Sequence, residues 1–147
     1  MADTGHGAAR SLPTKIRVTL VTPERSLVDE TVDELQIPGA EGYLGVLPGH
    51  APLFTEMKVG EFGYKKDGRW TWLVVAWGFA EVLPDHVRVL AETAERASEI
   101  DADRAKRARE RAEKRLRGGT GDLDYERASI ALQRALIRLQ VSQKMSV

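Results

Sequence analysis

Apolar and polar residues alternate in short runs from about residue 15 to residue 91 of the chain. Ile16, Val18 and Leu20 alternate with Arg17 and Thr19, and a period of two predicts a β-strand that buries one face. Comparable runs predict further strands near residues 32–37, 62–65, 70–75, 79–83 and 87–90. This part of the chain is therefore expected to consist of strands.

Turn-forming residues separate these runs at short intervals. The cluster Pro38–Gly42, the pair Asp67-Gly68 and the pair Pro84-Asp85 each fall between two apolar runs. Strands at this spacing, with Gly and Pro between them, are typical of an antiparallel sandwich or barrel. No helical pattern interrupts the runs, so a parallel α/β sheet is not expected.

The pattern changes at about residue 92. The segment 95–117 contains neither Gly nor Pro and is rich in Ala, Arg and Glu, which are good helix formers. Asp101 is expected to cap the start of this helix. The glycine-rich residues 118–121 end it, and Asp122 or Asp124 is expected to cap a second helix over most of the remaining chain. Two helices joined by a short turn predict an antiparallel hairpin.

Small apolar side chains recur at helical spacing in both predicted helices. Alanines let two helices approach closely but bury little area each. The hairpin is therefore expected to be marginally stable alone and to dock on the sandwich or on another surface. These residues are Ala102, Ala105, Ala108, Ala112 and Leu116 in the first helix, and Ala128, Leu132, Ala135, Leu136 and Leu139 in the second.

The patterns divide the chain into a flexible tail over residues 1–13, an all-β head over 14–94 and an α-helical hairpin over 95–147. The net charge is zero, but residues 1–94 have 9 basic and 13 acidic side chains, whereas residues 95–147 have 13 and 9. An acidic head therefore precedes a basic hairpin. A basic segment like this hairpin is typical of a contact with an anionic partner, or of a solvated helix surface.

Composition excludes several classes of site. The chain has no cysteine and three scattered histidines, so disulfides, thiolate metal sites and a zinc site are not expected. No run approaches the roughly 20 apolar residues of a membrane span, and the start lacks the apolar core of a signal peptide. Direct membrane insertion is not expected, and any link to a membrane runs through partner proteins.

No set of catalytic side chains stands out. The glycine- and proline-rich segment 38–52 lacks the Gly-Lys-Ser/Thr ending of a phosphate-binding loop, and no helix follows it. His50 in this segment has no Asp, Ser or second His near it in sequence, so a packed or turn-capping role is expected. The chain is predicted to have no catalytic centre and not to be an enzyme.

Arginines at helical spacing are the most suggestive polar feature. Arg104 and Arg111 on the first helix would face Arg134 and Arg138 on the second across a groove if the hairpin folds back on itself. Guanidinium groups that converge from two helices suit a polyphosphate. The alternative is a solvated surface with ion pairs four residues apart, and spacing alone favours it. Nucleic acid is not an expected ligand, because the chain is neutral and aromatic residues are not interspersed with the basic ones.

Four stretches of sequence resemble a known family. Glu41–Leu53, with the sequence EGYLGVLPGHAPL, is similar to the signature turn region of the epsilon subunits of bacterial F-type, proton-translocating ATP synthases. The segments 78–85 and 87–94 resemble the last strands of that family's head, and residues 122–128 resemble the start of its second C-terminal helix. The chain departs from the family at Ala76-Trp77, where a small Ser-Gly pair is usual.

The resemblance implies a non-catalytic rotor subunit of the central stalk, which couples proton flow to ATP synthesis. The head over residues 14–94 would be a flattened β-sandwich that binds the gamma subunit and the membrane ring of c subunits. The hairpin would lie folded on the head or extend along gamma. When extended, the family's basic helices reach acidic segments of the alpha/beta catalytic hexamer and inhibit ATP hydrolysis, a contact that the basic hairpin suits. The implied location is peripheral, at the cytoplasmic face of the bacterial plasma membrane.

One motif resembles an ATP-binding site within that family. The segment Ile100–Ala105, with the sequence IDADRA, is similar to the Ile/Leu-Asp-x-x-Arg-Ala motif of epsilon subunits whose folded hairpin binds ATP. The resemblance implies ATP, with or without Mg²⁺, as a regulatory ligand that holds the hairpin folded, while no cofactor is required. The residues that match the site in type are Glu95, Ile100, Asp101, Arg104, Ala105, Arg111, Arg134 and Arg138.

Two other functions stay open as alternatives. A stand-alone ATP-binding sensor would use the same arginines but would not co-purify with a gamma subunit. An enzyme with a site in the β-sandwich would show turnover by the isolated chain, and no set of catalytic residues supports it.

Overall fold

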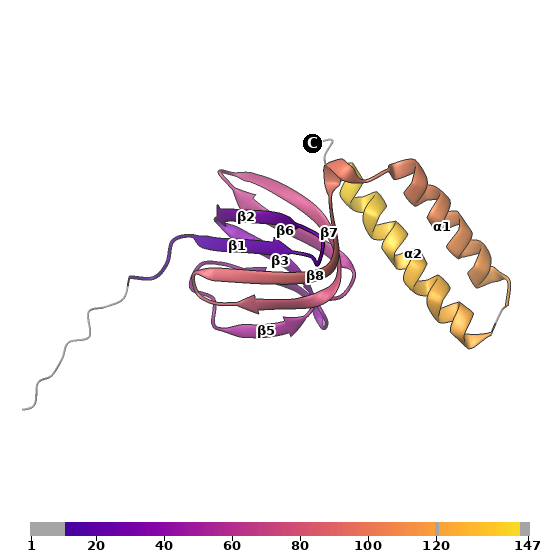
Figure 1. The fold of residues 1–147 in the computed structure, drawn as a ribbon, viewed down its shortest axis with the longest axis horizontal. Helices are drawn as coiled ribbons and strands as arrows, with labels where there is room; N and C mark the ends of the chain where they lie inside the picture. Colours follow the sequence, from indigo (N-terminus) through magenta and orange to yellow (C-terminus); the bar gives the residue numbers. More distant parts are fainter. Residues whose placement is uncertain (1–10, 120, 145–147) are drawn as a thin grey trace, which may run out of the picture.

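The computed structural model describes residues 11–119 and 121–144, without the side chain of residue 123. They form a head of strands and a hairpin of two helices beside it (Figure 1). The first ten residues of the predicted tail lie outside the described range. In chain order the elements are β1 (Ile16–Val21), β2 (Ser26–Val32), β3 (Glu34–Gly39), β4 (Gly42–Val46), β5 (Leu53–Glu56), β6 (Gly60–Lys66), β7 (Arg69–Val82), β8 (His86–Arg96), the short 3-10 helix η1 (Ala97–Glu99), α1 (Ala102–Arg117) and α2 (Asp122–Gln143).

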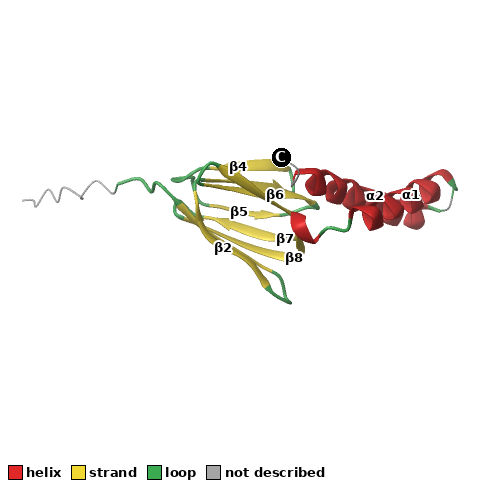
Figure 2. Cartoon of the chain, turned by 90° about the horizontal axis from the view of Figure 1, so that it is seen from above, coloured by secondary structure: helices red, strands yellow, loops and turns green. Residues whose placement is uncertain are grey.

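The strands form one folded sheet in the order β2-β1-β8-β7-β6-β3-β4, and β5 pairs with β7. β6 pairs with residues 69–75 of β7 and β5 pairs with residues 79–82, so β7 passes from one layer of the sandwich to the other. Figure 2 shows β4 and β6 on one side and β2 on the other. The predicted flattened β-sandwich is confirmed, but the described strands include one parallel pair, β1 with β8, in a sheet expected to be antiparallel.

Inward-facing side chains of both layers form one apolar core. The alternation predicted for the first strand is confirmed, because Ile16, Val18 and Leu20 are all fully buried. Phe62 of β6 is the largest fully buried side chain. Among the described residues, no polar or charged residue is buried. Candidate chemistry must therefore lie at the surface or between the head and the hairpin.

The strand β7 changes direction at Trp77 and Gly78. Its register with β8 is the same before and after this point, so no residue is inserted. Instead, the backbone takes positive φ angles of 60° at Trp77 and 108° at Gly78. A left-handed conformation costs a non-glycine residue about 1–2 kcal/mol. At position 77, where the family that the chain resembles usually has glycine, the substitution to Trp77 therefore strains the backbone. A glycine would adopt this φ without that cost.

The helices of the hairpin begin close to where the sequence places them. Asp101 accepts a hydrogen bond of 3.1 Å from the backbone N–H of Arg104, so the predicted cap of α1 is confirmed. The predicted cap of α2 is wrong, because Gly121 holds the N-cap position while Asp122 and Asp124 lie in the first turn. There they interact favourably with the positive end of the helix dipole. Within the described ranges, neither helix is long and apolar enough to cross a bilayer.

The hairpin docks on the head through the C-terminal end of α2. Val141 is fully buried, and Lys144 Nζ lies 2.7 Å from Glu61 Oε2 and 3.6 Å from the centre of the Trp72 ring. The Trp72 ring stacks on Trp70, with ring centres 5.1 Å apart. In Figure 1, α2 lies next to the sheet, and α1 lies on the side of α2 that faces away from the sheet. The expectation that the hairpin docks on the sandwich is thus met by α2.

Strand β8 extends into the segment that the sequence assigns to the hairpin. It continues to pair with the first half of β7, where Glu95 lies opposite Val74 and Arg96 opposite Leu73. The helical part of the chain therefore starts with η1 at Ala97. Because β8 ends beside α2, Glu95 and Arg96 lie at the junction of head and hairpin.

Candidate functional site

A pocket with an excess of positive charge lies between the head and α2. Its volume is 250 Å³. One side of it belongs to the head and the other belongs to the hairpin, so the pocket exists only while α2 is docked. The residues that line it are Arg25 from the turn between β1 and β2, Val74 and Ala76 of β7, Thr93, Ala94 and Glu95 of β8, and Arg134 and Arg138 of α2.

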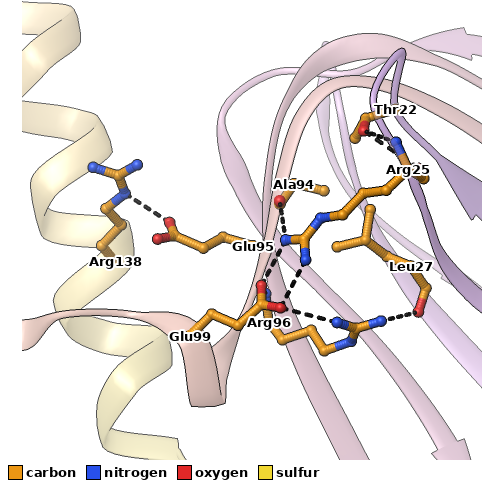
Figure 3. A network of polar contacts seen from close by, with 8 residues as sticks. All are labelled: Thr22, Arg25, Leu27, Ala94, Glu95, Arg96, Glu99 and Arg138. Carbon is orange, nitrogen blue, oxygen red and sulfur yellow. Dashed lines mark hydrogen bonds and ion pairs between the residues drawn. The ribbon is translucent and has the colours of Figure 1, made fainter.

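The two arginines of α2 reach the pocket from consecutive turns of the helix. Arg138 Nε donates a hydrogen bond of 2.9 Å to Glu95 Oε2, and Figure 3 shows this ion pair between α2 and β8. Arg134 Nε is shielded from solvent and has no hydrogen-bond partner among the described residues. An unsatisfied, shielded N–H is unfavourable. Of the two α2 guanidinium groups in the pocket, that of Arg138 is thus paired with a carboxylate and that of Arg134 has a free donor.

Arginines of both helices point to the same side of the hairpin. Buried alanines mark the seam between the helices, at positions 105 and 112 on α1 and 128 and 135 on α2. Arg104 and Arg111 each precede a seam alanine by one residue, as Arg134 does on α2, and Arg138 precedes buried Leu139. In two antiparallel right-handed helices, positions just before the seam turn to the same side. Four positive charges therefore share the side that faces the pocket.

Arg25 is held at the wall of the pocket by Glu99. Its Nη1 and Nη2 donate hydrogen bonds of 2.8 and 2.6 Å to the two carboxylate oxygens, and Nη2 also donates to the Ala94 carbonyl at 3.4 Å (Figure 3). Arg96 donates to the same carboxylate through its backbone N–H at 3.0 Å and through Nη1 at 2.9 Å. These bonds, above all those from Arg25, lower the pKa of Glu99 to about 2. The cluster fixes η1 against the β1–β2 turn.

The Glu99 cluster gives stability a defined pH dependence. Because the pKa of Glu99 falls from 4.5 to about 2 on folding, its stabilisation is complete above pH 4.5 and is lost as the pH falls toward 2. We expect Glu99→Gln to lower the free energy of unfolding by about 1–2 kcal/mol at neutral pH, since the cluster is partly exposed. Urea denaturation of both proteins, followed by tryptophan emission, should show this difference shrinking below pH 4.5. A difference that stays constant down to about pH 2 would contradict the assignment.

Three of the eight residues of the predicted ATP site meet in the pocket. Glu95, Arg134 and Arg138 all line it, although they lie about 40 residues apart in sequence. Glu95 comes from the end of a strand, whereas the arginines come from α2. The docking of α2 on the head is what brings them together.

The other five residues of the predicted site lie on α1 or in the connection that precedes it. Ile100 and Asp101 form the connection between η1 and α1, where Asp101 acts as the helix cap. Ala105 is buried in the seam. Arg104 and Arg111 are exposed on α1 and do not line the pocket. They share a side of the hairpin with the α2 arginines but leave their guanidinium groups in solvent.

Sequence reasoning missed Arg25 and Glu99. Arg25 lies in a turn between two strands and matches no motif. Its place at the pocket follows from the parallel pairing of β1 with β8, which brings the β1–β2 turn beside residues 93–95. Strand pairs so distant in sequence leave no signal in local periodicity. Only an alignment of related chains, or the fold itself, would identify Arg25.

The head also exposes a row of apolar side chains, here called the apolar patch and defined as Phe54, Phe79 and Leu90. Phe79 lies opposite Leu90 in the β7–β8 ladder, and the Phe54 ring stacks on Phe79 with centres 5.5 Å apart. Their exposed fractions are 66% for Phe54, 43% for Phe79 and 59% for Leu90. A groove lined partly by Val21 and Pro23 continues the patch. Contiguous exposed apolar groups of this kind mark interaction surfaces.

Comparison with protein families gives two adjoining matches. Residues 15–97 match the family described as the ATP synthase delta/epsilon chain, beta-sandwich domain. Residues 98–143 match the ATP synthase delta/epsilon chain, long alpha-helix domain. The two matches meet at the start of η1, where the head ends in the structure.

Curated relatives and solved structures agree with these matches. The ATP synthase epsilon chain of Geobacter metallireducens is 52% identical over 131 residues, which cover 88% of this chain and 95% of the relative. The epsilon chain of Syntrophobacter fumaroxidans is 48% identical over 130 residues, or 88% and 97%. A chain of the Euglena gracilis mitochondrial ATP synthase structure matches with a TM-score of 0.78 at 23% identity, covering 99% of this chain and 88% of that one. At this identity the likeness concerns the fold alone.

Proposed function

The chain belongs to the ATP synthase delta/epsilon chain family and is of its epsilon type, and from this premise we propose that it is a non-catalytic rotor subunit whose hairpin regulates ATP hydrolysis. In this proposal the head transmits rotation between the gamma subunit and the membrane ring of c subunits, which couples proton flow to ATP synthesis. The hairpin binds ATP while folded and inhibits hydrolysis when extended.

The observation that carries the regulatory proposal is the pocket between head and hairpin. Its free donor on Arg134 and the guanidinium of Arg138 suit a phosphate chain. Arg138 already donates to the Glu95 carboxylate, so a phosphate oxygen bound there would replace one anionic acceptor with another. The exposed Arg104 and Arg111 on the same side of the hairpin extend the positive surface toward α1.

Binding of ATP to the docked hairpin would shift its position by mass action. A ligand that binds only one form stabilises that form by about 2.7 kcal/mol when its concentration is 100 times its Kd. With abundant ATP the hairpin then stays on the head, and hydrolysis by the complex proceeds. With scarce ATP, the hairpin extends and its basic helices contact acidic segments of the alpha/beta hexamer.

Arg138→Ala and Arg104→Ala test the ATP site. We expect Arg138→Ala to bind ATP about 10–100-fold more weakly than the unmodified chain, because it loses a charge-assisted hydrogen bond to phosphate. Arg104→Ala should weaken binding by a smaller factor, because Arg104 adds positive charge beside the pocket without lining it. Titration calorimetry of the isolated chain measures this, with and without Mg²⁺. Arg117→Ala, at the exposed end of α1, is the matched control and should bind normally. An unmodified chain that gives neither heat nor chemical-shift changes with ATP would refute the regulatory proposal.

We further propose the apolar patch as the contact surface for the gamma subunit. Aromatic side chains that lose solvent on binding dominate most interfaces, and Phe54 and Phe79 are already stacked in the free head. The subunit would reside at the cytoplasmic face of the bacterial plasma membrane, held there as a peripheral part of the complex. A stand-alone ATP sensor would have no such partner.

A further inference from the structure

We propose that Arg25 of the head is a phosphate-binding residue of the pocket, so that a bound polyphosphate joins the head to the hairpin. This inference rests on the proposed binding of ATP. It adds a residue that lies outside the predicted site and outside the hairpin. Arg25 lines the same cavity as Arg134 and Arg138 but comes from the turn between β1 and β2.

The size of the cavity favours the phosphate chain over the rest of a nucleotide. At 250 Å³ it is smaller than the roughly 300–1,000 Å³ of typical small-molecule pockets. Three of its eight lining residues are arginines, and a single carboxylate, that of Glu95, is among them. Phosphate groups satisfy several guanidinium groups at once, because each carries several acceptor oxygens. The base and ribose would lie outside this cavity.

Arg25 is oriented for such a contact before any ligand arrives. Its guanidinium makes three hydrogen bonds, two to Glu99 and one to the Ala94 carbonyl. A guanidinium has five N–H donors, so the N–H of Nε and one N–H of Nη1 remain available. Figure 3 shows the side chain extended from the β1–β2 turn toward Ala94 and Glu99, while the backbone N–H of Arg25 donates to the Thr22 hydroxyl. A side chain already held in place loses less conformational entropy when it binds.

A ligand contact on the head explains how binding can hold the hairpin down. A ligand bound by hairpin residues alone would make the same contacts whether or not the hairpin touched the head. A ligand shifts an equilibrium only by its difference in affinity for the two forms. Contacts to Arg25 on one side and to Arg134 and Arg138 on the other exist only in the docked form. Arg25 therefore contributes to the difference in affinity between the docked and extended forms that regulation requires.

Four variants of the full-length chain separate ligand binding by Arg25 from its structural pairing with Glu99. They are Arg25→Ala, Arg25→Lys, Glu99→Gln and the control Arg17→Ala. Arg17 is an exposed residue near the start of β1 that pairs with Asp29 of β2. Each is titrated with ATP and with inorganic tripolyphosphate by calorimetry. We expect Arg25→Ala to bind both about 10–100-fold more weakly and Arg25→Lys to recover part of the loss. Glu99→Gln should lose less affinity than Arg25→Ala, because it keeps the Arg25 guanidinium and weakens only the contacts that hold it in position.

The outcomes decide between the two roles. Equal weakening in Arg25→Ala and Glu99→Gln would show that Arg25 acts only through the cluster that holds η1, and would overturn the inference. A loss for ATP but none for tripolyphosphate would overturn the assignment to phosphate. Normal binding by Arg25→Ala would refute the inference and leave the proposed ATP site intact. A complete lack of ATP binding by the unmodified chain would refute both.

Discussion

Replacement of Gly78 by alanine is expected to destabilise the head by about 4 kcal/mol or more, at the upper end of single-residue effects. A Cβ at this position would lie 1.9 Å from the Leu90 carbonyl oxygen and 2.9 Å from Ala91 Cα. Both atoms belong to the backbone of β8, which cannot move aside without breaking its ladders with β7 and β1. The φ of 108° at Gly78 adds further strain for any other residue.

Urea denaturation followed by tryptophan emission measures this effect. Gly45→Ala is the matched control, because Gly45 also lies in a strand but an added Cβ has no atom within 4 Å. The control should change the free energy of unfolding by no more than about 1 kcal/mol. None of the arginine variants of the candidate site is expected to lower the free energy of unfolding as much as Gly78→Ala does. A change below about 1 kcal/mol in Gly78→Ala would mean that β7 and β8 separate at this point at little cost.

The second large effect concerns the apolar patch. Phe79→Asp is expected to weaken binding of the chain to the gamma subunit by about 30–1,000-fold, because hot-spot aromatics contribute about 2–4 kcal/mol. The aspartate also brings an unpaired charge into the contact, which adds to the loss. Folding of the isolated head should survive, since Phe79 is 43% exposed before binding. Binding to purified gamma subunit, measured by surface plasmon resonance, gives the ratio directly.

Thr31→Asp provides the control for this experiment. Thr31 is exposed on β2, outside the patch, so it introduces the same charge at a different place on the head. The control should bind gamma with unchanged affinity. If Phe79→Asp and Thr31→Asp bind equally well, gamma contacts another surface. If the unmodified chain does not bind gamma at all, the rotor proposal fails and the stand-alone sensor becomes the better hypothesis.

Local sequence patterns predict the elements of this fold better than their pairing. The alternation at Ile16, Val18 and Leu20 marks an inward face because only one side of β1 is buried. The cap at Asp101 is equally local. The parallel pairing of β1 with β8 depends instead on the path of the whole sheet. The local pattern also does not predict that β7 continues through Trp77, because it predicts two separate strands at 70–75 and 79–83.

For the candidate site too, local patterns identify single residues better than the way in which those residues come together. Arg134 and Arg138 stand out because helical spacing places them on one face of α2. Their meeting with Glu95 depends on how α2 docks, which residues such as Val141 and Lys144 determine. No period in the sequence links a strand end to a helix that starts more than 25 residues later. The contribution of Arg25 is one step further removed, because it requires the sheet topology as well.

Both attachments of the hairpin lie at one end, and this makes it a lever with a free tip. α1 begins at the Ile100-Asp101 connection and α2 is held near Lys144, whereas the turn around Gly119 is the far end. The 16 residues of α1 give an arm of about 24 Å at 1.5 Å per residue. A tilt of about 10° at the base would move the tip by about 4 Å over that length. Small changes in the contacts beside the pocket are thus enlarged into a larger displacement at the tip.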